Sequence, residues 1–232
     1  MSRQNLAAVL MGVAFMTAAA SADTVLIDFN ARNGDASAGD PSTSGWNLFD
    51  ASNDLGTFGL VDSTGGASGF SIVVPDLNDS SNDGWDEGTY PPPVNGWAVG
   101  EAVNDYSWYT NASSAIDFVF TGLDDTKTYD FDIVISRTTA WQQDITLAGA
   151  NTQSVMGFNS NNDGYANGDT VSIDGVEPTA AGEVTLTVSY AAYTGGGTNN
   201  GVINALQMVE VPEPATLALL ALGATGLLRR RR

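Results

Sequence analysis

The 232-residue sequence contains neither cysteine nor histidine. Their absence excludes disulfides, thiolate nucleophiles, Ser-His-Asp triads and every metal, haem or iron–sulfur site that needs Cys or His ligands. Basic residues are also scarce, with 8 Lys and Arg against 27 Asp and Glu. The stretch from Asp23 to Glu213 holds all 27 acidic residues and only three basic ones, a net charge of −24. Such a surface repels phosphates and anionic lipid headgroups, so we expect no binding to nucleic acid.

Residues 1–22 have the pattern of a secretory signal peptide. Arg3 supplies positive charge ahead of an apolar run from Leu6 to Ala20, and the segment 20–22 reads Ala-Ser-Ala, a small-x-small cleavage pattern. We therefore expect a signal helix, export, and cleavage after Ala22 by signal peptidase. The alternative is a buried N-terminal helix, which neither the charge nor the cleavage pattern favours.

The C-terminal segment over 211–232 combines an acidic residue between prolines, an apolar run and a basic end. Its motif residues are Pro212, Glu213 and Pro214, and its basic residues are Arg229, Arg230, Arg231 and Arg232. The apolar run over 215–228 has 14 residues. As a helix it spans about 21 Å, against a hydrocarbon core of roughly 30 Å. This length suits a transient transmembrane helix with its arginines on the cytoplasmic side, and a permanent membrane anchor is the alternative.

This segment resembles the PEP-CTERM sorting signal of exopolysaccharide-producing Gram-negative bacteria. The resemblance rests on the Pro-Glu-Pro motif, the Ala-Thr-Leu that follows it, the Leu/Ala/Gly-rich run and the arginine cluster. It implies a transient anchor in the inner membrane and processing near the Pro-Glu-Pro motif by an exosortase. The final location would then be the cell surface or the extracellular matrix.

Residues 23–210 are expected to form one β-sandwich domain. Short runs rich in Val, Ile, Phe, Tyr and Thr recur between clusters of Gly, Asn, Asp and Ser. Apolar and polar residues alternate strictly in several runs, so one face of each strand meets water and the sheets should be antiparallel. The expected strands are 24–30, 57–61, 69–74, 97–103, 115–120, 128–136, 144–148, 170–174, 183–190 and 201–210. This pattern predicts an all-β antiparallel sandwich of the jelly-roll type.

The body also resembles the galactose-binding-like β-sandwiches of exported bacterial proteins, which often serve as carbohydrate-binding modules. The residues that carry this resemblance are Val25 to Phe29, Gly45-Trp46-Asn47, Gly122 to Tyr129 and Gly201 to Leu206. Related sandwiches accompany SGNH-type esterases, but the histidine that those enzymes need is missing here. The resemblance therefore implies sugar binding and no esterase activity.

Three groups of oxygen-bearing residues are candidate sites for a structural Ca²⁺. The segment 76–87 has five carboxylates and two Asn without a basic residue, and its candidate ligands are Asp76, Asn78, Asp79, Asp83 and Asp86. It departs from an EF-hand because Tyr90 stands where the last Glu belongs. The second group is 159–164 with Asp169, and the third is Asp28 with Asp23 or Asn204 if the terminal strands pair. The alternative is a set of solvated acidic loops and Asx-rich turns.

Sugar sites combine an exposed aromatic ring with acidic, amide or arginine groups that bind hydroxyls. Trp85 beside Asp86, and Trp141 near Arg137, have this composition. The alternatives are core packing for each tryptophan, and an ion pair or stacking on Trp141 for Arg137. The remaining tryptophans include Trp46 and Trp108, which we expect in the core.

The sequence therefore predicts an exported protein that binds exopolysaccharide without catalysis. Its partners would be signal peptidase and exosortase during export, the inner membrane transiently, and polysaccharide afterwards. One alternative is a purely structural matrix protein without a ligand site. Another is a glycan hydrolase, which would need two carboxylates at a set separation.

Overall fold

A computed structural model of the chain describes residues 23–29, 45–49, 56–74, 97, 107–110, 115–135, 142–159, 170–190 and 200–211. All of them belong to one compact unit, Asp23–Val211. Every regular element in these ranges is a β-strand, which confirms the all-β prediction. The expected signal and sorting helices lie outside the described residues, and no helix in the described part is long and apolar enough to cross a membrane.

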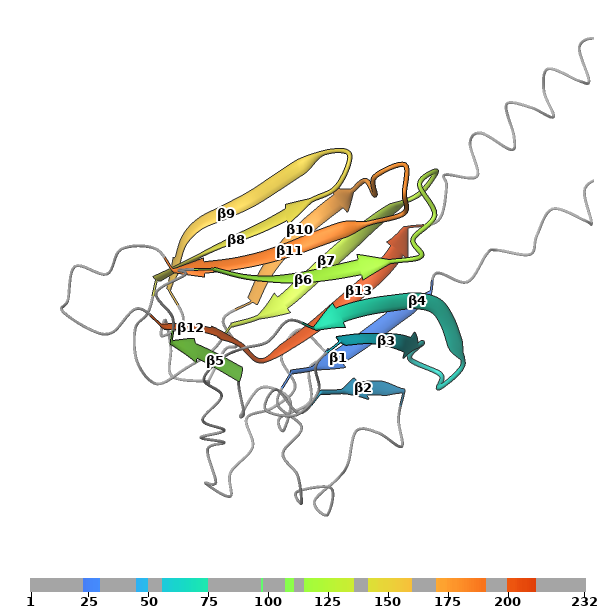
Figure 1. The fold of residues 1–232 in the computed structure, drawn as a ribbon, viewed down its shortest axis with the longest axis horizontal. Helices are drawn as coiled ribbons and strands as arrows, with labels where there is room; N and C mark the ends of the chain where they lie inside the picture. Colours follow the sequence, from blue (N-terminus) through green and yellow to red (C-terminus); the bar gives the residue numbers. More distant parts are fainter. Residues whose placement is uncertain are drawn as a thin grey trace, which may run out of the picture. The chain divides into compact units, whose positions relative to one another are not determined.

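The first sheet, sheet A, has five strands in the order β10-β7-β13-β1-β2 (Figure 1). Their bounds are β1 Thr24–Asp28, β2 Trp46–Leu48, β7 Thr128–Val134, β10 Thr170–Val176 and β13 Ala205–Val211. The first and last strands of the domain, β1 and β13, pair antiparallel. The expectation of purely antiparallel sheets is wrong at one place, because β1 and β2 run parallel. A parallel pair needs a crossover of a dozen or more residues, and the segment 30–44 is long enough for one.

The second sheet, sheet B, has six strands in the order β3-β4-β6-β11-β8-β9. Their bounds are β3 Gly56–Val61, β4 Ala67–Val74, β6 Ala115–Thr121, β8 Gln142–Ala148, β9 Thr152–Asn159 and β11 Val184–Tyr190. All neighbouring strands in sheet B pair antiparallel. Two short strands, β5 Ser107–Thr110 and β12 Asn200–Ile203, form a separate antiparallel pair.

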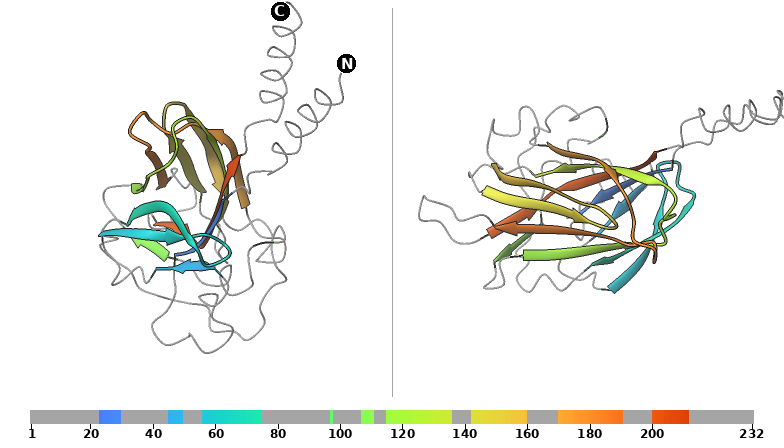
Figure 2. Two further views of the ribbon diagram at one scale, coloured as in Figure 1. Left: turned by 90° about the vertical axis from the view of Figure 1, so that its right-hand side faces the viewer. Right: turned by 90° about the horizontal axis from the view of Figure 1, so that it is seen from above.

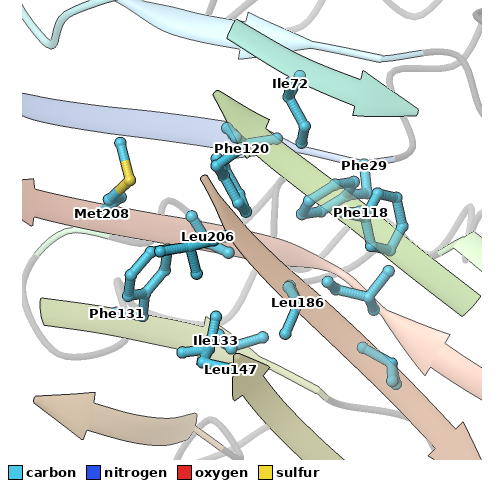
Figure 3. Packing of buried hydrophobic residues seen from close by; sticks show 14 of the residues in the cluster. Phe29, Ile72, Phe118, Phe120, Phe131, Ile133, Leu147, Leu186, Leu206 and Met208 are labelled. Carbon is cyan, nitrogen blue, oxygen red and sulfur yellow. The ribbon is translucent and has the colours of Figure 1, made fainter. Parts of the chain in front are cut away.

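The main core is built from the inward faces of both sheets. Phe131 and Met208 from sheet A, and Phe118, Phe120 and Leu186 from sheet B, are at most 1% exposed (Figure 3). Full burial of a side chain of this size contributes roughly 1.5–3 kcal/mol. The alternation that predicted the strands supplies these residues, because every second side chain of a strand points to the same face.

The expected strand 201–210 is two strands divided at Asn204. The backbone N–H of Asn204 donates to the Val134 carbonyl (3.0 Å), and its own carbonyl accepts from Phe29 N (2.9 Å). At this residue the chain therefore leaves the β12–β5 pair and enters sheet A. The hydrophobic pattern runs on through both strands, so it did not mark the break.

Three strands were not expected, namely β2, β5 and β9. Strand β2 has only three residues, and β9 is an edge strand in which polarity does not alternate. Neither therefore produces the period-two signal on which strand prediction depends. The expected strand 97–103 falls largely outside the described residues, and Trp97 itself lies in a turn.

Short turns and longer connections occupy opposite ends of the strands. At one end, named here the turn end, successive strands are joined through 62–66, 122–127, 149–151 and 177–183. Backbone hydrogen bonds link these turns, for example Leu123 N to Gly182 O (3.1 Å) and Ala150 N to Glu177 O (2.7 Å). At the other end, named here the connection end, the register aligns the strand ends Asp28, Val74, Val134, Asn159 and Tyr190. The segments 30–44, 75–96, 136–141, 160–169 and 191–199 begin from that end.

Candidate functional site

Most residues selected from the sequence lie outside the described residues. These are the processing and sorting residues Ala22, Pro212, Glu213, Pro214, Arg229, Arg230, Arg231 and Arg232, the sugar-site residues Trp85, Asp86, Arg137 and Trp141, and the metal-site residues Asp76, Asn78, Asp79, Asp83 and Asp86. In the second calcium candidate, Asn159 ends β9 and the residues after it are also outside. Their assigned roles stay predictions.

The described strands nevertheless fix where the segments with these residues attach. The segment with Trp85 and the acidic residues follows β4, which ends at Val74. The segment with Arg137 and Trp141 lies between β7 and β8. All three strands meet these segments at the connection end, so both sugar-site candidates belong to segments that begin there. Binding residues commonly occupy such segments at one end of a rigid scaffold.

Two tryptophans form an aromatic pair on the outward face of sheet A. Trp46 in β2 is 5% exposed, and its ring stacks on Trp97 with centroids 6.2 Å apart at 28°. Leu26, Val134 and Ala205 are buried beneath the pair and form a second apolar cluster with it. The prediction that Trp46 is a core residue is confirmed, although its core lies outside the main one. Trp108 lies in β5, and its side chain is outside the described residues.

Trp97 carries the one unsatisfied polar atom of this aromatic pair. Its Nε1 is buried and has no hydrogen-bond partner among the residues that the structure describes. A buried indole N–H normally finds an acceptor, so this donor is an exception among the buried polar groups of the described residues. Sequence reasoning missed Trp97, because its contact with Trp46 joins residues 51 positions apart and neither position contains a signal for the other.

Asp28 and Asn204 belong to neighbouring chain segments at the connection end. The terminal strands pair as the third calcium hypothesis required, with Asp28 opposite Ala205 and Phe29 N bonded to Asn204 O (2.9 Å). Asp28 and Asn204 are both buried, at 4% and 0% exposed. Asp23 lies at the other end of β1, so it is separated from this pair. Among the described residues, no group of three or more His, Cys, Asp or Glu is arranged to hold a metal ion.

A polar cluster occupies the turn end. Lys127 Nζ donates to Glu210 Oε1 (2.5 Å) and lies 4.0 Å from Asp124 Oδ2. The side chain of Glu210 is only 9% exposed, and that of Lys127 is 32% exposed. The Tyr129 hydroxyl is buried and accepts a hydrogen bond from Asp124 N (2.9 Å). These contacts fix the turn that leads into β7, so the Gly122 to Tyr129 element has a structural role.

The cluster shifts the acid–base behaviour of its members. The hydrogen bond from Lys127 to Glu210 raises the pKa of Lys127 above its ordinary value, against the opposing effect of burial. Burial raises the pKa of Tyr129. Hydrogen bonds from the hydroxyl and backbone N–H of Thr126 lower the pKa of Asp124. The cluster therefore favours protonated Lys127 and Tyr129 and ionised Asp124 at neutral pH.

Several carboxylates on the outward faces of the two sheets accept hydrogen bonds from neighbouring strands or turns. In sheet B, Asp117 accepts from the Thr187 hydroxyl (2.6 Å) and Asp144 from Gly157 N (2.6 Å). In sheet A, Asp130 accepts from Gly175 N (2.7 Å). These side chains connect one element to the next, which is what a structural role requires.

Solved structures that this chain resembles include a plant ectodomain and two carbohydrate-binding modules. The ANX2 ectodomain from Arabidopsis thaliana is 10% identical, with a TM-score of 0.41 over 68% of this chain and 54% of that one. TmCBM61, solved with β-1,4-galactotriose, is 13% identical, with a TM-score of 0.29 over 47% of this chain and 72% of that one. A family 35 carbohydrate binding module from an environmental isolate is 15% identical, with a TM-score of 0.24 over 69% of this chain and 100% of that one.

This chain spans 40–54% of the length of the plant receptor chains that it matches. No curated protein matches it by sequence. At the C-terminus, residues 210–232 match the model of the PEP-CTERM protein-sorting motif. The match begins at Glu210, inside β13, and includes the whole segment that the sequence singled out. The chain therefore carries a PEP-CTERM protein-sorting motif at its C-terminus.

Proposed function

We propose that this chain is an exported protein of the cell envelope or extracellular matrix that is sorted through an exosortase. The observation that carries the proposal is the PEP-CTERM motif match over 210–232. In this route signal peptidase cleaves after Ala22, the apolar run 215–228 holds the chain in the inner membrane for a time, and exosortase cleaves near Pro212. The four arginines keep the end of the anchor on the cytoplasmic side.

The domain itself, in this proposal, is a galactose-binding-like jelly roll that binds polysaccharide without catalysis. Two observations support this reading. The segments with Trp85 and with Arg137 and Trp141 begin from the same end of the strands, as binding segments on a rigid scaffold commonly do. Trp46 and Trp97 form a stacked aromatic pair on the outward face of sheet A, apart from the main core. A structural Ca²⁺ in the acidic segment 76–87 would offset the repulsion among its carboxylates.

A purely structural matrix role is the second candidate. It is favoured by the outward carboxylates Asp117, Asp130 and Asp144, which are occupied in hydrogen bonds between strands and turns. In that case the domain would contribute bulk and charge to the matrix and would have no discrete ligand site. The two candidates share the sorting route and differ in polysaccharide affinity.

The sorting proposal is tested by expressing the full chain in a bacterium that has an exosortase and in an isogenic strain that lacks it. Cell fractions and medium are then probed for the chain and its size. We expect a shortened product at the surface or in the medium of the first strain, and a longer, membrane-bound form in the second. A Pro212→Ala/Pro214→Ala variant should behave in the first strain as the wild type does in the second. Equal size and distribution in both strains would refute the proposal.

A further inference from the structure

The last strand of the domain is paired on both sides and leads directly into the sorting motif. Strand β13 lies between β7 and β1, and Figure 2 shows β13 and β1 side by side in both views. Its inward residues Leu206 and Met208 are fully buried in the core. In the sheet order, β13 is the strand that joins β1 and β2 to β7 and β10. Loss of β13 would therefore divide sheet A.

The final residues of β13 also have hydrogen-bond and register partners in the domain. Glu210 N donates to the Asp23 carbonyl (2.9 Å), and the Glu210 carboxylate accepts from Lys127 Nζ (2.5 Å). Val211 is in register with Thr128 of β7. Lys127 is the only Lys or Arg among the described residues. The one basic side chain of the described part is thus hydrogen-bonded to Glu210, the residue at which the match to the sorting motif begins.

Both expected processing points adjoin this pair of strands. Asp23 follows the expected signal-peptidase cleavage point at Ala22, and Val211 precedes Pro212 of the motif. The hydrogen bond from Glu210 to Asp23 therefore joins the two ends of the domain at the turn end. The connection end, with its candidate binding segments, is opposite.

We propose that the folded domain sets the limit of its own processing, so that the exosortase cut falls after Val211 and leaves β13 complete. The proposal rests on the proposed sorting route. The peptide bond of the substrate is hydrolysed by water, giving a new carboxyl end on the domain and a new amino end on the released tail. Asp23 and Glu210 then stay paired in the mature protein, with both ends at the turn end.

The physical reason is that proteases bind their substrate as an extended segment whose backbone groups are free. Bonds inside a paired strand meet this condition only during local opening. Lys127 acts here as a positioning residue, because its hydrogen bond to Glu210 opposes fraying of β13 toward Val209. Without it, we expect cleavage within 207–211 to increase about tenfold, from the usual strength of a hydrogen bond between charged groups.

The test is the C-terminus of the exosortase-dependent product of the full chain, read by intact mass and terminal peptide sequencing. We expect one product that begins at Asp23 and ends at or after Val211. A wild-type product that lacks any residue of β13 would overturn the inference. Lys127→Met should add products that end within 207–211, and Lys127→Arg should not. A Lys127→Met product identical to that of the wild type would refute the role of Lys127.

Limited proteolysis of the purified full chain with a broad-specificity protease tests this inference without exosortase, and therefore independently of the proposed sorting route. The earliest C-terminal cut should fall after Val211 in the wild type and within 207–211 in Lys127→Met. Asn47→Ala, which removes hydrogen bonds to β1 and β3, controls for a general loss of stability, and its additional cuts should not concentrate within 207–211. Early cuts inside β13 in the wild type would contradict the inference, whereas a chain that exosortase leaves uncut would contradict the sorting proposal alone.

Discussion

Lys127 illustrates how much a single residue contributes in so acidic a domain. Its ammonium is hydrogen-bonded to Glu210, 83 positions away, and lies near Asp124 at the start of the same turn. Glu210 is nearly buried, so its charge needs this partner more than an exposed carboxylate would. Tyr129, buried beside them, bonds the backbone of the same turn. The turn end therefore depends on a cluster of ionisable groups that pH can disturb.

Stability should fall in alkaline solution. The pKa values of Lys127 and Tyr129 are both raised in the folded protein, above about 10.5 and 10.0 in the unfolded chain. Their contribution is therefore complete below those unfolded values and is lost as pH rises through the folded ones. At pH 7 we expect Lys127→Met to lower the free energy of unfolding by about 1–2 kcal/mol. Above pH 10 this difference in the free energy of unfolding between the variant and the wild type should become smaller.

Denaturant unfolding at pH 7 to 12, followed by tryptophan fluorescence, measures this dependence. Lys127→Arg is the matched control, because it keeps a cation that stays charged throughout this pH range. The explanation would be contradicted if the difference in the free energy of unfolding between wild type and Lys127→Met stayed constant or increased with rising pH.

At the scale of the element, the short strand β2 depends on one side chain. Asn47 Nδ2 donates to the carbonyls of Leu26 and Val61 (both 2.9 Å), and its Oδ1 accepts from Val61 N (2.8 Å). These bonds connect β2 and β1 of sheet A to β3 of sheet B. The preceding Gly45 has φ of +83°, and a Cβ there would lie 2.4 Å from Ser63 O, so no other residue fits.

We expect Asn47→Ala to cost about 2–4 kcal/mol of stability, because it leaves buried backbone groups of two strands without partners. Asn47→Asp keeps the acceptor for Val61 N and loses both donors, so its loss should be at least as large once the cost of a buried charge is included. Thr152→Ala, an exposed change on β9, serves as the control. Thermal unfolding of the purified variants gives the comparison, and a melting temperature of Asn47→Ala equal to that of Thr152→Ala would contradict the assigned role.

Sequence reasoning succeeded where the pattern was local and failed where it depended on topology. Strands such as β7 and β11 were predictable because apolar and polar residues alternate along most or all of their length. The parallel pairing of β2 and the break at Asn204 depend on partners distant in the sequence. The edge strand β9 pairs with its sequence neighbour β8, and it was missed because its polarity does not alternate. The buried position of Trp46 was predictable from residue type, whereas its contact with Trp97 was not.

At the scale of the whole domain, the two ends of the strands have different roles in our proposal. The turn end contains the paired termini, Asp23 and Val211, together with the Lys127 cluster. The connection end is where the segments with Trp85, Arg137 and Trp141 begin. A chain held through its terminal segments would therefore have its candidate ligand-binding segments at the end away from the points of attachment. This arrangement allows polysaccharide binding before as well as after processing.

The central claim, that this sorted domain binds polysaccharide, is tested most directly by its melting temperature. The purified chain is melted in EDTA, in Ca²⁺, and in Ca²⁺ with exopolysaccharide, because a ligand that binds only the folded state raises the melting temperature. We predict that polysaccharide raises the melting temperature of the wild type and that this rise is lost in Trp85→Ala and in Trp141→Ala. Met156→Ala is the control, because the Met156 side chain is exposed (68%), and it should retain the rise. No rise with polysaccharide in the wild type, with or without Ca²⁺, would contradict the claim and leave the structural matrix role in its place.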